Sequence, residues 1–231
     1  MRPLLRLLSP LLPGAARRRL WHAHLPASPL RDCLAVPPPA RRTDWRQAPY
    51  LALDLETTGG DPARDDILSF GWVCLEGEEI RLATARHRLV RPRRALNETS
   101  VTVHRITDDR AAQGEPLETV LRDFLADLAG RVLIAHYSPT ETGFVNAACQ
   151  ACYGGPLLTP VIDTLALARA EQPMHPPGSL RLGALRARHH LPRYPLHHAL
   201  SDALAAAELF LAQAQALSRG GPLSLGRLLL D

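Results

Sequence analysis

The sequence contains no lysine, so each of its 27 basic residues is an arginine. It has only four cysteines in 231 residues, too few for the disulfide framework of a small secreted protein, and we expect reduced cysteines and a cytoplasmic location. The first apolar run, residues 4–16, is interrupted by Arg6, Pro10 and Pro13 and cannot cross a bilayer as a continuous helix. The small number of cysteines excludes a disulfide scaffold, and the interrupted apolar run predicts no membrane-spanning helix.

The sequence does have enough apolar residues for a buried core. Hydrophobic residues make up 46% of the chain, which suits one well-buried domain with an appendage. The net charge of +4 is uneven, because residues 1–49 hold nine arginines and two acids whereas residues 50–231 hold 18 arginines and 21 acids. We predict a basic N-terminal extension rich in arginine and proline over residues 1–47, one domain over residues 48–218 and a C-terminal tail over residues 219–231.

The N-terminal extension fits three roles. Its arginines could hold a phosphate backbone without reading sequence. It could instead be a solvated, partly disordered segment, or a targeting segment, since no acid precedes Asp32. Within it, residues 29–34 could form a short helix that packs on the domain, and the triple proline at 37–39 predicts a stiff junction.

Hydrophobic periodicity predicts a meander of three strands followed by alternating helices and strands. The predicted strands cover residues 51–56, 67–75, 79–90 and 132–135, with a hairpin turn at Gly77. The predicted helices cover residues 115–128, 140–152, 164–170, 180–189 and 199–217. Cys149 and Cys152 lie three positions apart in one of these helices, and we interpret them as packed helix residues rather than half of a zinc site or a redox pair.

Two acids mark the end of the first predicted strand. Side chains alternate between the faces of a strand, so Asp54 and Glu56 project from one face while Leu53 and Leu55 point into a core on the other. Two neighbouring carboxylates repel each other unless a cation neutralises them, and hard oxygen ligands favour Mg²⁺ or Mn²⁺. A solvated strand with a chance Asp-x-Glu is the alternative, so further carboxylates are needed to support a metal site.

Further acids follow at the starts of two predicted helices. Ile134-Ala-His136-Tyr-Ser-Pro-Thr-Glu141-Thr-Gly-Phe144 leads into one helix, and His197-His-Ala-Leu-Ser-Asp202 leads into another. Together with Asp54-Leu-Glu56-Thr-Thr-Gly, they resemble the three exonuclease motifs of the DnaQ-like, or DEDDh, family of 3′→5′ exonucleases, the family of the proofreading subunit of bacterial DNA polymerase III. The resemblance covers approximately residues 48–217 and includes residues 103–107 and 162–165.

The resemblance implies a fold and a set of metal ligands. It implies an α/β architecture, a ribonuclease-H-like mixed β-sheet flanked by helices. Asp54 would bridge two Mg²⁺ or Mn²⁺ ions, Glu56 and Asp202 would complete the site that holds the nucleophile, and Glu141 would serve the second ion. Glu141 departs from the family, which usually has Asp there, and a glycine usual among residues 104–107 is also missing. We interpret Glu141 as a functional replacement, because its spacing from His136 and Phe144 is kept.

The resemblance also assigns the general base. His197 lies five residues before Asp202, the family's spacing for this group, and an imidazole can take a proton from water near neutral pH. His198 is the competing candidate for the general base. The alternative for either residue is a surface histidine at a helix N-terminus without a catalytic role.

Three further residues are candidates for holding the 3′-terminal nucleotide. Thr57 and Thr58 directly follow the acidic strand, and Phe144 either packs against the base or fills the core. Asp163 resembles a fifth ligand, but its position predicts a helix N-cap. His136 and His104 are more typical of hydrogen-bonded structural histidines.

These patterns favour a metal-dependent 3′→5′ exonuclease that releases nucleoside monophosphates from single-stranded or frayed DNA ends. The alternatives are an exoribonuclease of the same fold and a nucleic-acid-binding module with impaired catalysis. The expected partner is single-stranded nucleic acid, with DNA preferred over RNA. A polymerase or a repair protein could be a second partner. Two arginine groups could follow the strand: Arg81, Arg86, Arg88, Arg91, Arg93 and Arg94, and Arg181, Arg186, Arg188 and Arg193. Aromatic residues, at 5%, are too few for extensive base stacking.

Overall fold

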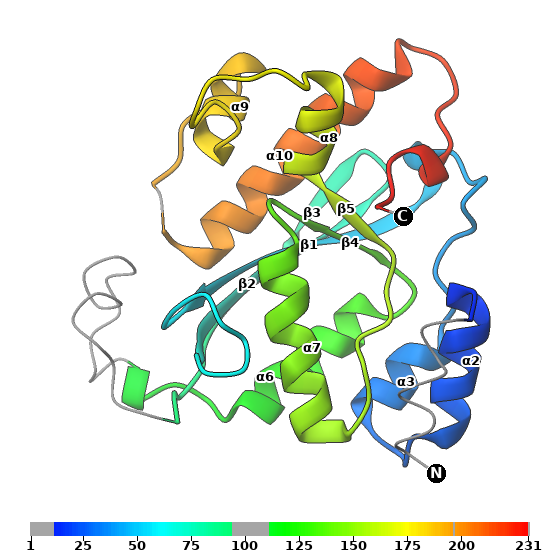
Figure 1. Cartoon of the computed structure of the whole chain (residues 1–231), viewed down its shortest axis with the longest axis vertical. Coiled ribbons are helices and arrows are strands. Elements are labelled where there is room, and N and C mark those ends of the chain that lie inside the picture. The colour runs from blue at the N-terminus through cyan, green and yellow to red at the C-terminus, as the bar shows by residue number, and fades with distance from the viewer. Residues whose placement is uncertain (1–11, 94–110, 196, 231) are drawn as a thin grey trace.

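A five-stranded mixed sheet forms the centre of the molecule (Figure 1). The computed structural model describes residues 12–93, 111–195 and 197–230. The strand order is β3-β2-β1-β4-β5; β1, β2 and β3 are antiparallel, whereas β4 and β5 run parallel to β1. The strands are β1 (Pro49–Thr57), β2 (Ile67–Glu76), β3 (Glu79–Leu89), β4 (Val132–Ala135) and β5 (Val161–Asp163). This is the ribonuclease-H-like mixed sheet that the motifs imply.

Helices cover both faces of the sheet, and alternate residues of β1 enter two separate cores. Leu51, Leu53 and Leu55 pack on one side with α6 (Leu117–Leu128) and α7 (Pro139–Tyr153). Tyr50 and Ala52 pack on the other side with α10 (Ala199–Ser218). The period of two therefore directs the acids that continue this second series toward α10. Among the described residues, no helix is long and apolar enough to cross a membrane.

The predicted meander and the main helices are confirmed, with boundaries shifted by one or two residues. The helices α8 (Thr164–Glu171) and α9 (Leu182–Arg188) complete the predicted set. Among the described strands and α-helices, two were not predicted: β5, which has only three residues, and α2 (Gly14–His24), which lies in the N-terminal extension. Neither the length of β5 nor the arginine-rich sequence of α2 gives a strong periodic signal.

Two helices of the N-terminal extension pack on the domain. Trp21 of α2 and Leu30 of α3 (Pro29–Ala35) are buried in the core that contains α6, which confirms the predicted packing of a short helix. Arg18 is also buried, and its guanidinium donates to the carbonyls of Leu34 (3.0 Å), Leu158 (2.7 Å) and Cys33. It thereby satisfies carbonyls at the end of α3 that have no partner within the helix.

The C-terminal tail also packs on the domain. Leu223, Leu225 and Leu228 are buried with α10 in the second core, and the tail includes a 3₁₀ turn, η3 (Leu225–Arg227). A bridge joins Asp44 to Ser224, so the segment that precedes β1 meets the C-terminal tail beside the second core. The four cysteines are all free, as expected, and Cys149 is buried in α7.

Candidate metal and active site

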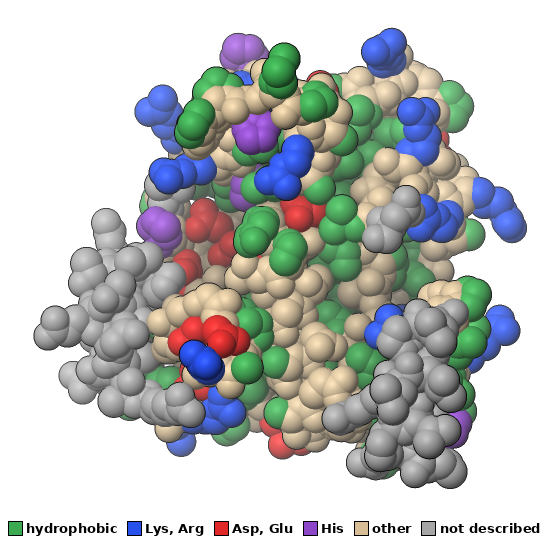
Figure 2. Space-filling view, in the orientation of Figure 1, with side chains coloured by type: hydrophobic (Ala, Val, Ile, Leu, Met, Phe, Trp, Pro, Cys, Tyr) green, Lys and Arg blue, Asp and Glu red, His purple; other side chains and the backbone are tan. Residues whose placement is uncertain are grey.

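Three carboxylates from two elements meet at the end of β1. Asp54 and Glu56 lie on the face of β1 that α10 covers, and Asp202 lies in the first turn of α10. One oxygen of each carboxylate lies within 4.8 Å of the others. Acidic side chains gather in a recess of the face shown in Figure 2. The structure thus brings together three of the four acids predicted as ligands.

A close approach between α10 and the sheet brings Asp202 to this position. Gly71 of β2 pairs with Asp54 of β1, and a Cβ at Gly71 would lie 2.0 Å from the backbone carbon of Ala199. Only a glycine leaves room for the first turn of α10 to rest on the strand. Gly71 was not predicted as a site residue, because a single glycine in a strand pattern does not reveal which element lies above it.

The three acids form an electrostatically unfavourable cluster. The pKa of Asp54 is raised well above its ordinary value, mainly because the carboxyl is buried. The negative charges of Glu141, Asp202 and Glu56 raise it further. Burial also raises the pKa of Asp202, although the backbone N–H of His197 donates to its Oδ2 at 2.9 Å. A divalent cation would offset this repulsion, and carboxylate oxygens are the ligands that Mg²⁺ and Mn²⁺ prefer. The donor set therefore fits a metal site.

Glu141 lies near the cluster but outside the group of three. It lies in the first turn of α7, the residue is only 4% exposed, and its Oε2 lacks a hydrogen-bond partner among the described residues. Burial raises the pKa of Glu141 to about 8. A buried carboxylate oxygen without a partner is costly. Its position and this unmet oxygen fit a fourth ligand, direct or through water.

Asp163 has a structural role beside the candidate site. It caps α8, as predicted, by accepting from the backbone N–H groups of Leu165 (2.9 Å) and Ala166 (3.3 Å). It also accepts from the N–H groups of Tyr137 (3.0 Å) and Ser138 (2.9 Å), just before α7. Asp163 thus fixes the turn that leads to Glu141.

The predicted structural role of His136 is confirmed. The Nδ1 of His136 lies 2.8 Å from Oγ1 of Thr164, and burial lowers the pKa of His136. His104 and the segment 103–107 lie outside the described residues.

The two adjacent histidines differ in their roles. His198 is the N-cap of α10, and its side chain accepts from the backbone N–H of Ser201. His197 precedes it in a left-handed conformation with φ 63°, which a residue other than glycine adopts only when its surroundings impose it. The side chain of His197 is exposed and interacts electrostatically with Asp202. The side chain of His197 therefore interacts with a predicted ligand, whereas that of His198 caps α10.

The predicted nucleotide-binding residues fall into two groups. Thr57 and Thr58 follow the acids on β1 and are partly buried; the Thr57 hydroxyl donates to the carbonyl of Gly59 at 2.7 Å. Phe144 is 2% exposed and packs in the core with α6, which is the second of the two roles considered for it. Its ring is not presented to a base.

Most of the described arginines in the two predicted groups are engaged within the protein. Arg88 pairs with Glu115 and Asp123, and Arg93 pairs with Asp66 at 2.7 Å. Arg186 is buried, so it cannot follow a strand as predicted. Arg94 lies outside the described residues.

The sequence as a whole matches a known family. The family model RNase_T, described as an exonuclease, matches residues 51–210, which include all four predicted acidic ligands. The chain belongs to this exonuclease family. Among the relatives of the RNase_T chain is the PolC-type DNA polymerase III of Thermotoga maritima, 30% identical over 174 residues, which are 75% of this chain and 12% of that protein. The enzyme of the same name from Staphylococcus aureus is 28% identical over 179 residues, 78% of this chain and 12% of that protein. The chain thus spans about an eighth of the length of these curated relatives.

Solved structures share the fold of this RNase_T exonuclease domain. The nuclease domain of 3′hExo, described as a DEDDh family member bound to rAMP, has a TM-score of 0.65 at 17% identity, covering 82% of this chain and 99% of that one. Exonuclease I of E. coli in complex with a dA16 oligonucleotide has a TM-score of 0.66 at 18% identity, covering 75% of this chain and 42% of that one. These likenesses confirm the ribonuclease-H-like architecture.

Proposed function

We propose that this chain is a divalent-metal-dependent 3′→5′ exonuclease that releases nucleoside 5′-monophosphates from single-stranded or frayed DNA ends. The observation that carries the proposal is the approach of Asp54, Glu56 and Asp202 to within 4.8 Å of one another, in a chain of the RNase_T exonuclease family. A chance surface cluster would not require the close approach at Gly71 or the buried Glu141.

Each acid has a role in this proposal. Asp54 would contribute to both of two metal sites, Glu56 and Asp202 would complete one of them, and Glu141 would serve the other. Two ions in such a cluster supply charge neutralisation at the scissile phosphate and at the leaving oxygen. His197 accepts the proton of the attacking water as the general base. Thr57 and Thr58 hold the 3′-terminal nucleotide.

DNA is the preferred substrate because the PolC-type relatives are DNA polymerases, and their context makes a polymerase or repair partner the proposed assembly. An exoribonuclease is the second candidate, favoured by the rAMP bound in the structure of 3′hExo. We also propose the division into residues 1–47, 48–218 and 219–231, and a reducing location such as the cytoplasm, which the free cysteines suit.

The test is a gel assay of 3′-labelled and 5′-labelled DNA and RNA oligonucleotides with Mg²⁺, Mn²⁺ or EDTA. We expect the 3′ label to appear at once as a mononucleotide and the 5′ label to shorten stepwise, and EDTA should stop both. Asp202→Ala should abolish turnover, whereas Glu171→Ala, which removes an exposed acid of α8, should not. Release of 5′-labelled mononucleotides, or full activity of Asp202→Ala, would contradict the proposal. Faster cleavage of RNA would select the second candidate, and binding without cleavage would select the impaired module.

A further inference from the structure

A pocket of about 370 Å³ adjoins the acidic cluster, between α9, residues 189–195 and α10. Asp202 belongs both to the cluster and to the lining of this pocket, so the pocket begins where the proposed metal site ends. Its volume is typical of a small-molecule site. Its walls are mainly apolar and include Leu182, Ala187, Leu191, Pro192 and Ala205.

A hydrogen-bonded network holds the back of the pocket in place. Arg186 is 3% exposed and donates to the carbonyls of Ala205 (2.7 Å) and Pro192 (2.8 Å), which joins the pocket loop to α10. It also pairs with Glu208 at 2.7 Å, and its guanidinium stacks over the ring of Tyr194. The charge of Arg186 is therefore neutralised within the protein, and the network builds a fixed wall.

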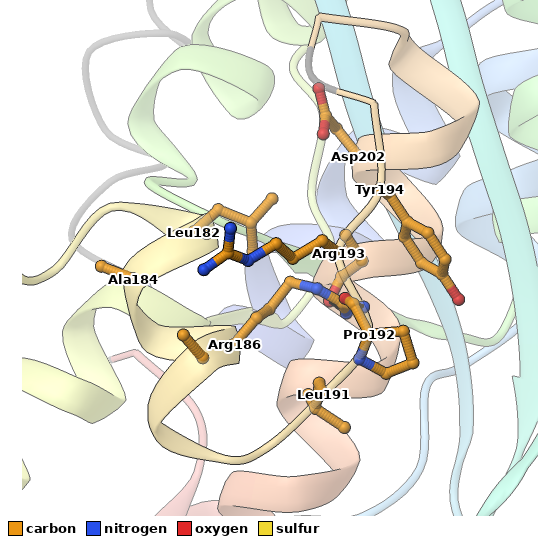
Figure 3. Close-up of a pocket in the computed structure, with 11 residues that line it drawn as sticks. Leu182, Ala184, Arg186, Leu191, Pro192, Arg193, Tyr194 and Asp202 are labelled. Atoms are coloured by element: carbon orange, nitrogen blue, oxygen red, sulfur yellow. Dashed lines mark hydrogen bonds between the residues drawn. The ribbon is translucent and has the colours of Figure 1, made fainter.

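Arg193 differs from Arg186 because no acid among the described residues pairs with it. It is exposed, it lines the pocket, and it makes no hydrogen bond or ion pair with the described residues. Figure 3 shows its side chain extending across the pocket toward Leu182, while Tyr194 points away. An exposed guanidinium beside apolar walls suits a ligand with an anionic group and an apolar face.

The position of the pocket defines which part of a substrate would reach it. In the proposed function, the 3′-terminal nucleotide lies at Thr57 and Thr58 and its phosphate at the acids. Asp202 lines the pocket, whereas Thr57 and Thr58 do not, so the nucleotide on the other side of that phosphate is the one nearest to the pocket. We propose that this pocket binds the penultimate nucleotide of a single strand, with its base on the apolar wall and a backbone phosphate on Arg193. This assignment rests on the proposed function.

The phosphate contact is tested by the affinity of short, labelled, single-stranded DNA, measured by fluorescence anisotropy with Ca²⁺ in place of Mg²⁺. Arg193→Ala should weaken binding about ten-fold and lower the slope of log affinity against log salt by about one. Arg188→Ala is the matched control, because it removes an equal charge from an exposed position of α9 outside the pocket lining. It should change the affinity less than two-fold. Equal effects of the two variants would overturn the proposal.

The base contact is tested by an oligonucleotide that lacks the penultimate base. The wild-type protein should bind this abasic strand about ten-fold more weakly than the complete strand, because a base on an apolar or aromatic surface contributes about that much. Ala187→Phe fills the pocket from an exposed helix position and should bind both strands alike. An unchanged abasic penalty in this variant would overturn the assignment. Because the readout is binding, a protein that shows both effects but cleaves nothing would contradict the proposed function alone.

Discussion

At the scale of single residues, the hydrogen-bond partners of a buried acid determine whether its oxygens are available to a cation. The position of the acid relative to a motif does not show this. Asp163 lies between two candidate motifs, yet four backbone N–H groups occupy its oxygens. Glu141 has the opposite character, because its Oε2 is buried and unmet among the described residues. A free carboxylate oxygen beside other acids is available to a cation, whereas a saturated one is not.

Glu141 makes the stability of the metal-free protein depend on pH. Its pKa is about 8 in the folded protein and about 4.5 in the unfolded chain, so the folded state holds the extra proton between these values. The free energy of unfolding in EDTA should therefore fall as the pH rises through this range, by up to about 1.4 kcal/mol for each unit of pKa difference. Urea denaturation between about pH 5 and pH 9 measures it.

Glu141→Gln should reduce that slope, because the amide does not titrate. Glu171→Gln, at an exposed position, should leave it unchanged. If Glu141→Gln shows the wild-type slope, the carboxyl is not buried as described. The same variant should lose activity, since Gln offers no charge to a metal, whereas Glu141→Asp should retain much of it.

The two histidines can be separated with asparagine, which tolerates a left-handed backbone and is also a good N-cap. His197→Asn should lower the maximal rate about 10²-fold or more and remove the acidic limb of the pH profile, because it removes the general base. His198→Asn should keep the cap of α10 and therefore keep both the rate and the limb. Steady-state kinetics across pH distinguish the two, and the reverse pattern would reassign the base to His198.

At the scale of elements, the active site depends on how closely α10 approaches the sheet. β1 carries two of the acids and α10 carries the third, so their distance is set by packing between the elements. The contact at Gly71 brings the first turn of α10 onto β2, directly opposite Asp54. A wider approach would separate Asp202 from the other two carboxylates.

Gly71→Ala should therefore damage the site without touching any acid. The new Cβ would overlap the backbone of Ala199, so α10 must move outward, and overpacking of this kind typically costs about 1–3 kcal/mol. We expect lower stability together with weaker Mn²⁺ binding, measured by calorimetry on the folded variant. Gly14→Ala is the control, because nothing lies within 4 Å of a Cβ there. Wild-type metal affinity in Gly71→Ala would show that the approach does not position Asp202.

At the scale of the whole molecule, the N-terminal segment contributes to the fold of the exonuclease domain. Arg18 connects α2 to the end of α3 and to Leu158, across 140 positions of sequence. The tail residues Leu223 and Leu225 close the opposite side of the sheet. The domain therefore has structural contributions from both ends of the described chain.

Replacing Arg18 should expose this dependence. Arg18→Met removes the donor from four carbonyls, of which those of Cys33 and Leu34 are buried, at about 1–3 kcal/mol for each buried unsatisfied group. The variant should therefore unfold at a clearly lower urea concentration. Arg19→Met removes the neighbouring exposed arginine and should have little effect on the midpoint. If both variants unfold like the wild type, the segment is not part of the cooperative unit.

The sequence by itself determined which acids could form a metal site and the order of most elements. Period-two alternation in β1 separates Asp54 and Glu56 from Leu53 and Leu55, and this pattern can be read locally because each strand residue points opposite to the next. The spacing from His197 to Asp202 likewise lies within one segment. Long, strongly periodic helices such as α6 and α10 were predicted for the same reason.

The tertiary structure alone decided which groups are available to a ligand. Arg186 and Arg193 belong to one arginine-rich stretch, yet Glu208 neutralises the first and the described residues leave the second exposed. Arg18 is buried in a segment whose composition suggested a solvated arm. In each case the partners lie far away in sequence, and burial depends on contacts that local patterns do not contain. Composition counts charges, but only the fold determines which of them are already paired.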